Sequence, residues 1–241
     1  MNSERHAQQS RRDFLRTVAL SAGVASLPGT VRAADAVEPA QAPAALEATV
    51  YFSLGPDEAA FVEALVTVLC PADEYTPSGV DCGLAVFIDR QLAGAFGKGE
   101  RLYLRGPWRS GRPEDGYQLP LTPEKFFKVG LAAANRACGQ KHGQDFSALS
   151  AADADAFLQD VADGKFSQAE VALAEWFNEL VYPLFTQACF ADPLYGGNRD
   201  KVFWKMVGYP GLPAVNGVNM VKYRGKPFPG SRAPKSIEDF S

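Results

Sequence analysis

The sequence predicts an all-α fold: a single helical domain of about five to six helices with long irregular loops and an extended C-terminal arm. Apolar side chains recur at helical spacing in five separate segments. Proline, glycine and helix-capping residues stand at the borders of those segments. The two-residue alternation that marks a half-buried strand is not evident. With 241 residues, 46% of them hydrophobic, the chain is long enough for one sizeable core.

The first two expected helices lie on either side of a loop rich in proline and glycine. The first begins at Pro56, because proline suits a first helical turn, and Asp57 and Glu58 follow near the positive end of the helix dipole. Pro71 ends this helix, and the second helix ends near Gly94. Their apolar stripes are Phe61, Leu65, Val68 and Leu69, then Leu84, Phe87, Ile88 and Leu92.

Three further helices complete the predicted domain. Thr122 caps the third, Ser150 caps the fourth, and Gly164 ends the fourth. The fifth and longest spans about residues 168–190, and we expect Pro183 to bend it. Their apolar positions include Phe126, Phe127, Leu131 and Ala134, then Phe157, Leu158 and Val161, then Leu173, Trp176, Phe177, Leu180, Leu184 and Phe185.

The N-terminus has the basic, apolar, small-residue order of a signal peptide. Arg11 and Arg12, followed by Phe14 and Leu15, indicate the twin-arginine (Tat) route, which carries folded proteins. The alternative is a chance arginine pair in a basic arm. The predicted parts are a signal peptide, a flexible leader, a helical domain and an extended arm, over residues 1–34, 35–52, 53–211 and 212–241.

Charge and motifs argue against several classes of function for the chain that remains after the signal peptide is removed. It has 19 basic and 26 acidic residues, a net charge of −7, which makes it a poor nucleic-acid binder. No second apolar stretch reaches membrane-spanning length, so we expect membrane contact only through a partner. Nucleotide-binding, hydrolase and c-type haem motifs are missing, so we expect no cofactor and no catalytic residue in this chain.

The four cysteines are Cys70, Cys82, Cys138 and Cys189. An even number outside the cytoplasm suggests disulfides, and three connectivities are possible. Cys70 closes one predicted helix and Cys82 opens the next, which favours that pair and leaves Cys138 with Cys189. Four buried thiols are the alternative, because the chain is expected to fold in the reducing cytoplasm.

A long irregular excursion covers residues 97–120. Loops of this length usually have a function or pack on a partner. It carries the aromatic residues Tyr103, Trp108 and Tyr117 beside Arg101, Arg105, Arg109 and Arg112. Two interpretations stay open: the aromatic side chains bind a partner, or they fold back onto the domain's own core.

The segment 192–211, called the knuckle below, consists of two glycine- and proline-rich clusters around one short amphipathic helix. It either caps the bundle or presents a rigid aromatic surface to a partner, with Tyr195 and Trp204 as the best contact candidates. The predicted partner-binding residues here are Asp192, Pro193, Tyr195, Gly196, Gly197, Asn198, Trp204, Tyr209, Pro210 and Gly211. We expect the arm over 212–241 to order only on the partner.

The knuckle also carries a resemblance. The string ADPLYGGNRDKVFWKMVGYPG resembles the C-terminal signature of the small subunit of gluconate 2-dehydrogenase-type enzymes. The strings FIDRQLAGAFGKGERLYLRGPW and CPADEYTPSGVDCG are similar to the same family. One departure is Phe203, where the family pattern more often has glycine.

The resemblance implies a periplasmic complex at the inner membrane. In such complexes a large flavoprotein of the glucose–methanol–choline (GMC) type holds FAD, and a multihaem cytochrome c passes electrons to quinone. The small subunit supplies the export signal to the Tat translocase and supports maturation of the flavoprotein. The relatives oxidise gluconate, 2-ketogluconate, fructose, sorbitol or glucose. The alternatives are a stand-alone enzyme built around His142, Asp192 and Tyr195, and a free periplasmic chaperone.

Overall fold

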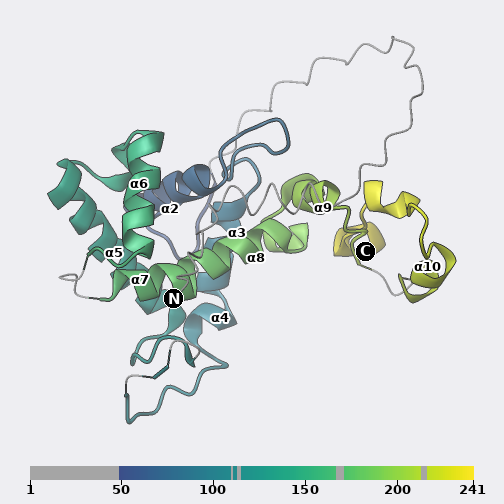
Figure 1. The fold of residues 1–241 in the computed structure, drawn as a ribbon. Helices are drawn as coiled ribbons and strands as arrows, with labels where there is room; N and C mark the ends of the chain where they lie inside the picture. The colour runs from purple at the N-terminus through teal and green to yellow at the C-terminus, as the bar shows by residue number, and fades with distance from the viewer. Residues whose placement is uncertain (1–48, 110, 113–114, 167–170, 213–215) are drawn as a thin grey trace, which may run out of the picture. The chain divides into compact units, whose positions relative to one another are not determined.

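The structure is a computed structural model, and the fold that it describes is helical. Figure 1 shows helices joined by loops, and the described part of the chain contains no β-strand, which confirms the predicted all-α class. No helix in this part is both long and apolar enough to cross a bilayer. The described residues are 49–241, except 110, 113–114, 167–170 and 213–215.

The contacts divide the chain into two units, Met1–Thr49 and Val50–Ser241, and every described helix belongs to the second. The predicted signal peptide over 1–34, with its arginine pair, lies outside the described residues. So does most of the predicted leader. These two predictions therefore stay predictions.

The first two helices, α2 (Pro56–Leu69) and α3 (Leu84–Ala93), form where the sequence predicts them. The N–H of Gly55 donates to the Glu58 carboxylate at 2.8 Å, which closes the start of α2. The N–H of Cys70 closes its last turn, and proline follows. Gly94 ends α3, as expected.

The next elements are α4 (Ala95–Lys98), α5 (Pro123–His142), η2 (Phe146–Ala148) and α6 (Ala151–Ala162). Both predicted caps form. Thr122 Oγ1 accepts the N–H of Lys125 at 3.4 Å, and Ser150 Oγ accepts the N–H of Asp153 at 3.2 Å. The α4 turn occupies the start of the expected 97–120 excursion, and the rest of it is irregular where described.

The expected fifth helix is a continuous run of three pieces, α7 (Leu173–Glu175), the π-helical η3 (Trp176–Val181) and α8 (Tyr182–Phe190). It begins at 173 in the described residues instead of about 168. The irregularity is a widened turn immediately before Pro183. Proline has no N–H and its ring crowds the preceding turn, so a π turn accommodates it without ending the helix.

The core is centred on Trp176, which is completely buried. Its indole Nε1 donates to the backbone oxygen of Phe127 at 3.0 Å. A methyl group placed on Gly130 of α5 would overlap the indole ring, so this position accepts only glycine. The Phe61 ring of α2 lies 6.5 Å from the indole and 4.6 Å from Phe146. Aromatic contacts therefore join α2, α5 and η3.

The C-terminal part contains η4 (Pro193–Tyr195), η5 (Arg199–Lys201), α9 (Val202–Val207), α10 (Asn216–Lys222), η6 (Pro229–Arg232) and η7 (Ile237–Phe240). The described residues thus form more helical segments than the five to six expected. The additional ones are short turns closed by local hydrogen bonds, which have too few residues to show an apolar period.

The end of the predicted arm over 212–241 returns to the knuckle. Lys235 pairs with Gly211 in an isolated parallel bridge, and the N–H of Leu212 donates to Lys235 O at 2.7 Å. Ser236 is buried. The arm is therefore an excursion anchored at both ends, because polar contacts rather than apolar anchors hold its last residues.

Candidate partner-binding surface

The knuckle is attached to the bundle by a buried asparagine. Asn198 is 0% exposed, and its backbone has a left-handed φ of 47°. Its Nδ2 donates to Ala191 O at 3.0 Å, and its Oδ1 accepts the N–H of Phe203 at 3.0 Å. One side chain thus ties the end of α8 to the start of α9. Asparagine suits this position because it tolerates left-handed backbone and bonds locally.

Two glycines bring the knuckle backbone into direct contact with neighbouring backbone. A side chain on Gly197 would overlap Ala188 O of α8, and a side chain on Gly83 would overlap Gly196 O. Gly196 has a φ of +104°, which disfavours any other residue. These glycines therefore position the surface, and the first two are too enclosed to contact a partner.

The turn that precedes α3 is hydrogen-bonded to the knuckle. The backbone N–H of Arg199 donates to Cys82 O at 3.0 Å, and its guanidinium donates to Asp81 O at 3.0 Å. Arg90 of α3 also reaches Leu194 O at 3.4 Å. The knuckle is thus held by hydrogen bonds to segments more than 100 residues earlier.

Trp204 is 4% exposed and lies inside the knuckle. Its Nε1 donates to Phe190 O at 2.8 Å, and its ring meets Tyr209 edge-on at 5.1 Å. The bundle-cap interpretation accounts for these contacts. In this arrangement Trp204 fixes α9 on the end of α8 and has almost no surface to offer to a partner.

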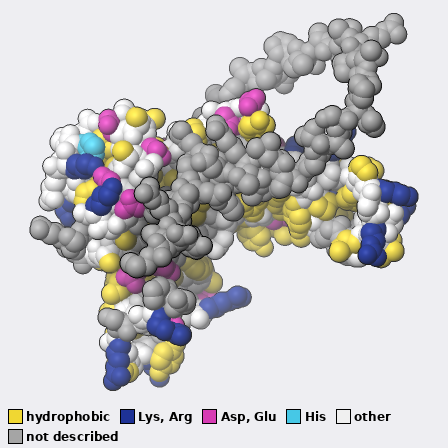
Figure 2. All heavy atoms as spheres, viewed as in Figure 1, with side chains coloured by type: hydrophobic (Ala, Val, Ile, Leu, Met, Phe, Trp, Pro, Cys, Tyr) yellow, Lys and Arg dark blue, Asp and Glu magenta, His cyan; other side chains and the backbone are white. Residues whose placement is uncertain are grey.

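Apolar side chains do reach the surface around this buried frame. Figure 2 shows hydrophobic side chains gathered over α8 and α9. Tyr195 is 49% exposed, and Tyr209 and Pro210 also reach solvent. The sequence analysis missed further members, which carry no capping or glycine signal of their own: Phe190, Leu194, Val207 and Leu212.

An open groove of about 460 Å³ runs between α3, α8 and the knuckle. Phe87 and Gln91 line it from α3, Phe190 from α8, and Asp192 and Tyr195 from the knuckle. Its lining is mainly apolar and includes the amide side chains of Gln91 and Gln187. The groove, together with the exposed apolar residues of α8, the knuckle and the residue after it, is called the knuckle face below; these residues are Phe190, Leu194, Tyr195, Val207, Tyr209 and Leu212.

The aromatic side chains of the excursion after α4 lie in different environments. Tyr117 folds back and packs against Phe126 with the rings tilted and their centroids 4.4 Å apart, which matches the own-core interpretation. Tyr103 is 79% exposed between Leu102 and Leu104, which are also exposed. Trp108 is half-buried. The partner interpretation therefore stays available for Tyr103 and in part for Trp108.

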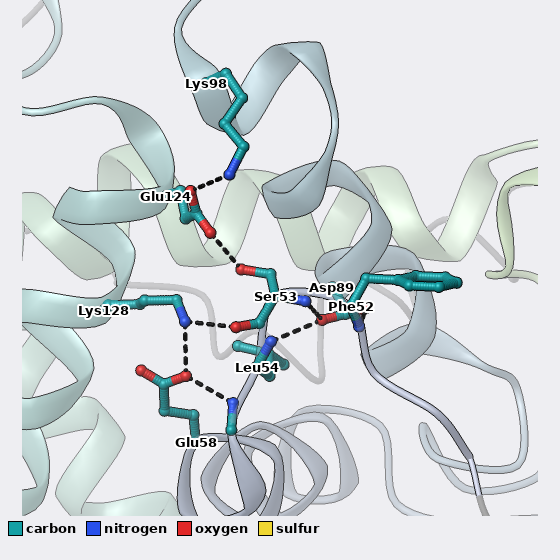
Figure 3. Close-up of polar contacts among 9 residues, drawn as sticks. Phe52, Ser53, Leu54, Glu58, Asp89, Lys98, Glu124 and Lys128 are labelled. Carbon is teal, nitrogen blue, oxygen red and sulfur yellow. Dashed lines mark hydrogen bonds and ion pairs between the residues drawn. The ribbon is translucent and has the colours of Figure 1, made fainter.

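A buried carboxylate anchors the start of the described chain (Figure 3). Asp89 of α3 is 1% exposed and accepts three backbone N–H groups. Phe52 donates at 2.7 Å, Ser53 at 2.8 Å and Leu54 at 2.9 Å. Three donors satisfy the buried charge, so the segment leading from the predicted leader is fixed to α3.

An ion-pair network completes this anchor (Figure 3). Lys128 of α5 binds Ser53 O and the Glu58 carboxylate, the latter at 2.9 Å. The Ser53 hydroxyl donates to Glu124 at 2.7 Å, and Lys98 pairs with Glu124 at 2.6 Å. The hydrogen bond from Lys98 lowers the pKa of Glu124. Residues of α2, α4 and α5 thus hold the segment Phe52–Leu54, called the strap below.

The four cysteines are free and buried in this structure. Cys70 and Cys82 lie together, since both thiols reach Pro77 O, at 3.8 and 3.5 Å. Cys138 contacts Gln144 O at 3.4 Å in a different part of the bundle. The expected Cys70–Cys82 pair is therefore adjacent, whereas no contact among the described residues joins Cys138 to Cys189.

Polar chemistry is sparse on the knuckle face. Within the described ranges, no three His, Cys, Asp or Glu side chains are grouped as metal ligands. His142, Asp192 and Tyr195, the residues of the stand-alone enzyme hypothesis, are not joined by any described contact. Asp192 instead uses its carboxylate on the backbone N–H groups of Leu194 and Ile237. Asp192 therefore fixes backbone at the start of the knuckle and in the last turn of the chain.

The fold and this face define a small helical domain with an exposed apolar surface, whose backbone is held by buried hydrogen bonds. The chain belongs to the gluconate 2-dehydrogenase subunit 3 family, whose family model matches residues 56–211. The match begins at the first residue of α2 and ends at the last residue of the knuckle. No curated protein and no solved structure gave a match. The family is a subunit of a multi-subunit dehydrogenase, which implies partner subunits.

Proposed function

We propose that this chain is the non-catalytic accessory and export-escort subunit of a periplasmic, membrane-bound, FAD-dependent sugar or sugar-acid dehydrogenase. The observation that carries the proposal is the family match over residues 56–211, because that family is a subunit of a dehydrogenase complex. In this proposal the chemistry lies in a GMC-type flavoprotein that holds FAD. A multihaem cytochrome c takes the electrons and provides the membrane contact.

The knuckle face is the proposed docking surface for the flavoprotein. Its apolar members project from a frame fixed by Asn198, Trp204 and the backbone contacts at Gly197, so little backbone freedom remains to be lost on binding. Phe190, Tyr195 and Tyr209 are the aromatic side chains that it exposes, and exposed aromatic residues in such patches commonly dominate binding free energy.

Export is the second part of the proposal. The Tat signal around Arg11 and Arg12 would carry this chain and the folded, FAD-loaded flavoprotein together. A force applied to the leader must pass into the folded domain. The strap at Phe52–Leu54, which donates three hydrogen bonds to Asp89, is suited to that task.

Co-expression with a tagged flavoprotein tests both parts. Leu194→Asp with Tyr209→Asp places two charges on the knuckle face and should abolish co-purification. Val129→Asp on α5 is the matched control, because Val129 is similarly exposed and lies outside the face. It should pair as the wild type does.

Arg11→Lys with Arg12→Lys should leave both the chain and the flavoprotein activity in the cytoplasmic fraction. The proposal fails if flavoprotein activity reaches the periplasm while this chain stays behind. It also fails if the two charged substitutions on the knuckle face leave pairing unchanged.

A further inference from the structure

Three of the four thiols in the described chain belong to one cluster. Cys70 ends α2, Cys82 precedes α3, and both lie against the carbonyl of Pro77. The interaction between the two thiols lowers the pKa of Cys70 and raises the pKa of Cys82. The two sulfurs are therefore direct neighbours, and Cys70 is the more acidic of the pair.

Cys189 of α8 is the third member of the cluster. Burial raises its pKa, and the charge of an ionised Cys70 raises it further, which places it near the pair. Asp73 and Asp81 are the carboxylates that act on the pair, and both oppose thiolate formation. Cys70, which is the one of the three whose pKa is lowered, is thus the best placed to attack an oxidant.

The pair lies under the knuckle. The turn 79–83 joins the two cysteines' helices: Gly79 N–H donates to Cys70 O at 2.8 Å, and Leu84 N–H donates to Gly79 O at 3.0 Å. The same turn accepts the N–H of Arg199 at Cys82 O and touches Gly196 O at Gly83. The position of this turn therefore sets the position of the knuckle.

We propose that Cys70 and Cys82 are a redox lock for the knuckle face: thiols in the cytoplasm, and a disulfide after export that fixes the turn 79–83. The expectation that the oxidised chain releases its partner more slowly rests on the proposed function. The disulfide and its effect on the turn 79–83 do not depend on that function. A disulfide that closes this short loop suppresses the local opening motions in which the end of α2 separates from the turn 79–83. The face would then be adjustable during assembly and rigid afterwards.

The chemistry is a thiol–disulfide exchange with a protein or glutathione disulfide as the oxidant. The Cys70 thiolate attacks one oxidant sulfur, forms a mixed disulfide and releases the other sulfur as a thiolate. Cys82 loses its proton to solvent and attacks the Cys70 sulfur, which releases the second oxidant sulfur. Two thiols of the chain are oxidised by two electrons, and one disulfide is reduced to two thiols.

The bond is tested on the purified full chain with oxidised glutathione, followed by peptide mapping without reductant. The expected product is an internal Cys70–Cys82 link, with Cys138 and Cys189 recovered as thiols. Cys82→Ser should stop at a mixed disulfide on Cys70, and Cys138→Ser, the matched control, should form the link normally. A dominant link through Cys189 or Cys138, or no link, overturns the inference.

Hydrogen exchange at the Arg199 amide tests the lock itself, because this N–H donates to Cys82 O. Oxidation should slow its exchange by about tenfold or more, and reduction should restore the original rate. Equal rates in the two states overturn the inference. Cys82→Ser should show no dependence on oxidant.

The flavoprotein provides the last measurement. Oxidised chain should dissociate from it about tenfold more slowly than reduced chain, and equal dissociation rates overturn the lock. If the flavoprotein binds neither form, the proposed function fails. The link and the Arg199 exchange then still decide whether the pair controls the turn.

Discussion

The carboxylate of Asp192 accepts the backbone N–H of Ile237 at 2.9 Å, so the first residue of the knuckle holds the last turn of the chain. Its other oxygen accepts the N–H of Leu194 at 3.1 Å. Lys201 of the knuckle forms an ion pair with Asp239 in the same last turn. The knuckle and the returning end of the arm are therefore one structural unit.

Asp192→Ala should destabilise the fold by about 2 kcal/mol, because two backbone N–H groups lose their acceptor in a largely buried place. Urea unfolding measures the loss. Asp192→Asn should cost less, since its one amide oxygen still serves one of the donors. Glu238→Ala, at an exposed carboxylate in the same turn, is the control and should change stability by less than about 0.5 kcal/mol. An equal effect from both alanine variants would contradict the anchoring role.

The ion pair gives the end of the arm a defined pH dependence. The hydrogen bond from Lys201 holds the pKa of Asp239 well below its ordinary value, and the Ser236 N–H acts in the same direction. A depressed folded-state pKa means that the stabilisation is present above the unfolded pKa of about 4 and is lost as pH falls below it. Exchange protection of the Ser236 amide should therefore fall below about pH 4. In Asp239→Asn it should be low and independent of pH across that range.

The Asp89 anchor predicts a local defect at the start of the domain. Asp89→Ala leaves three backbone donors without their acceptor and should cost about 3 kcal/mol in urea unfolding. Protease cleavage near Ser53 should accelerate, because the strap loses its attachment to α3. Glu74→Ala, at an exposed carboxylate in the loop after α2, is the control; it should change stability by less than about 0.5 kcal/mol and leave the cleavage rate unchanged. Unchanged cleavage in Asp89→Ala would show that Lys128 alone holds the strap.

Two glycines of α5 predict opposite effects of one substitution. Gly130→Ala places a methyl group into the indole ring of Trp176 and should destabilise by about 1–3 kcal/mol. Gly139→Ala meets no atom within 4 Å and should stabilise by up to about 1 kcal/mol through helix propensity. Thermal unfolding of the two variants measures both signs. Stabilisation by Gly130→Ala would contradict the packing of Trp176 on α5.

The sequence was informative where the physics is local. Capping at Thr122 and Ser150 depends on residues within one turn, and both helices begin where their caps predict. No local pattern marks Gly130, because glycine is required there by the indole ring of Trp176, which lies 46 residues later in the chain. The return of the arm likewise depends on Asp192 and Ile237, which no short-range pattern connects. The π turn at 176–181 was expected only as a bend at Pro183.

The surface was harder to predict than the fold. The stretch 202–207 is apolar on more than one side, so periodicity does not distinguish the buried Trp204 from the exposed Val207. Burial depends on where α9 meets α8, which the buried Asn198 determines. The groove lies between helices from distant parts of the sequence, and Phe87 and Tyr195 meet there only after folding. The exposed residues Phe190, Leu194, Val207 and Leu212 therefore became identifiable only in the structure.

Trp204 and Tyr195 separate the two interpretations of the knuckle. Trp204→Ala removes a buried ring and its bond to Phe190 O, so it should cost about 3–5 kcal/mol in urea unfolding. Trp204→Phe retains most of the volume and should cost less. Tyr195→Ala removes an exposed ring and should change stability by less than about 0.5 kcal/mol.

Pairing with the flavoprotein should then follow a different order. Tyr195→Ala should weaken binding by about tenfold or more, because its ring belongs to the exposed face that the proposed function assigns to the partner. Trp204→Phe should bind nearly as the wild type does, since it alters the frame and not the face. Binding titrations on the folded variants give both values. Weak binding by Trp204→Phe together with normal binding by Tyr195→Ala would move the contact surface away from the groove and onto α9.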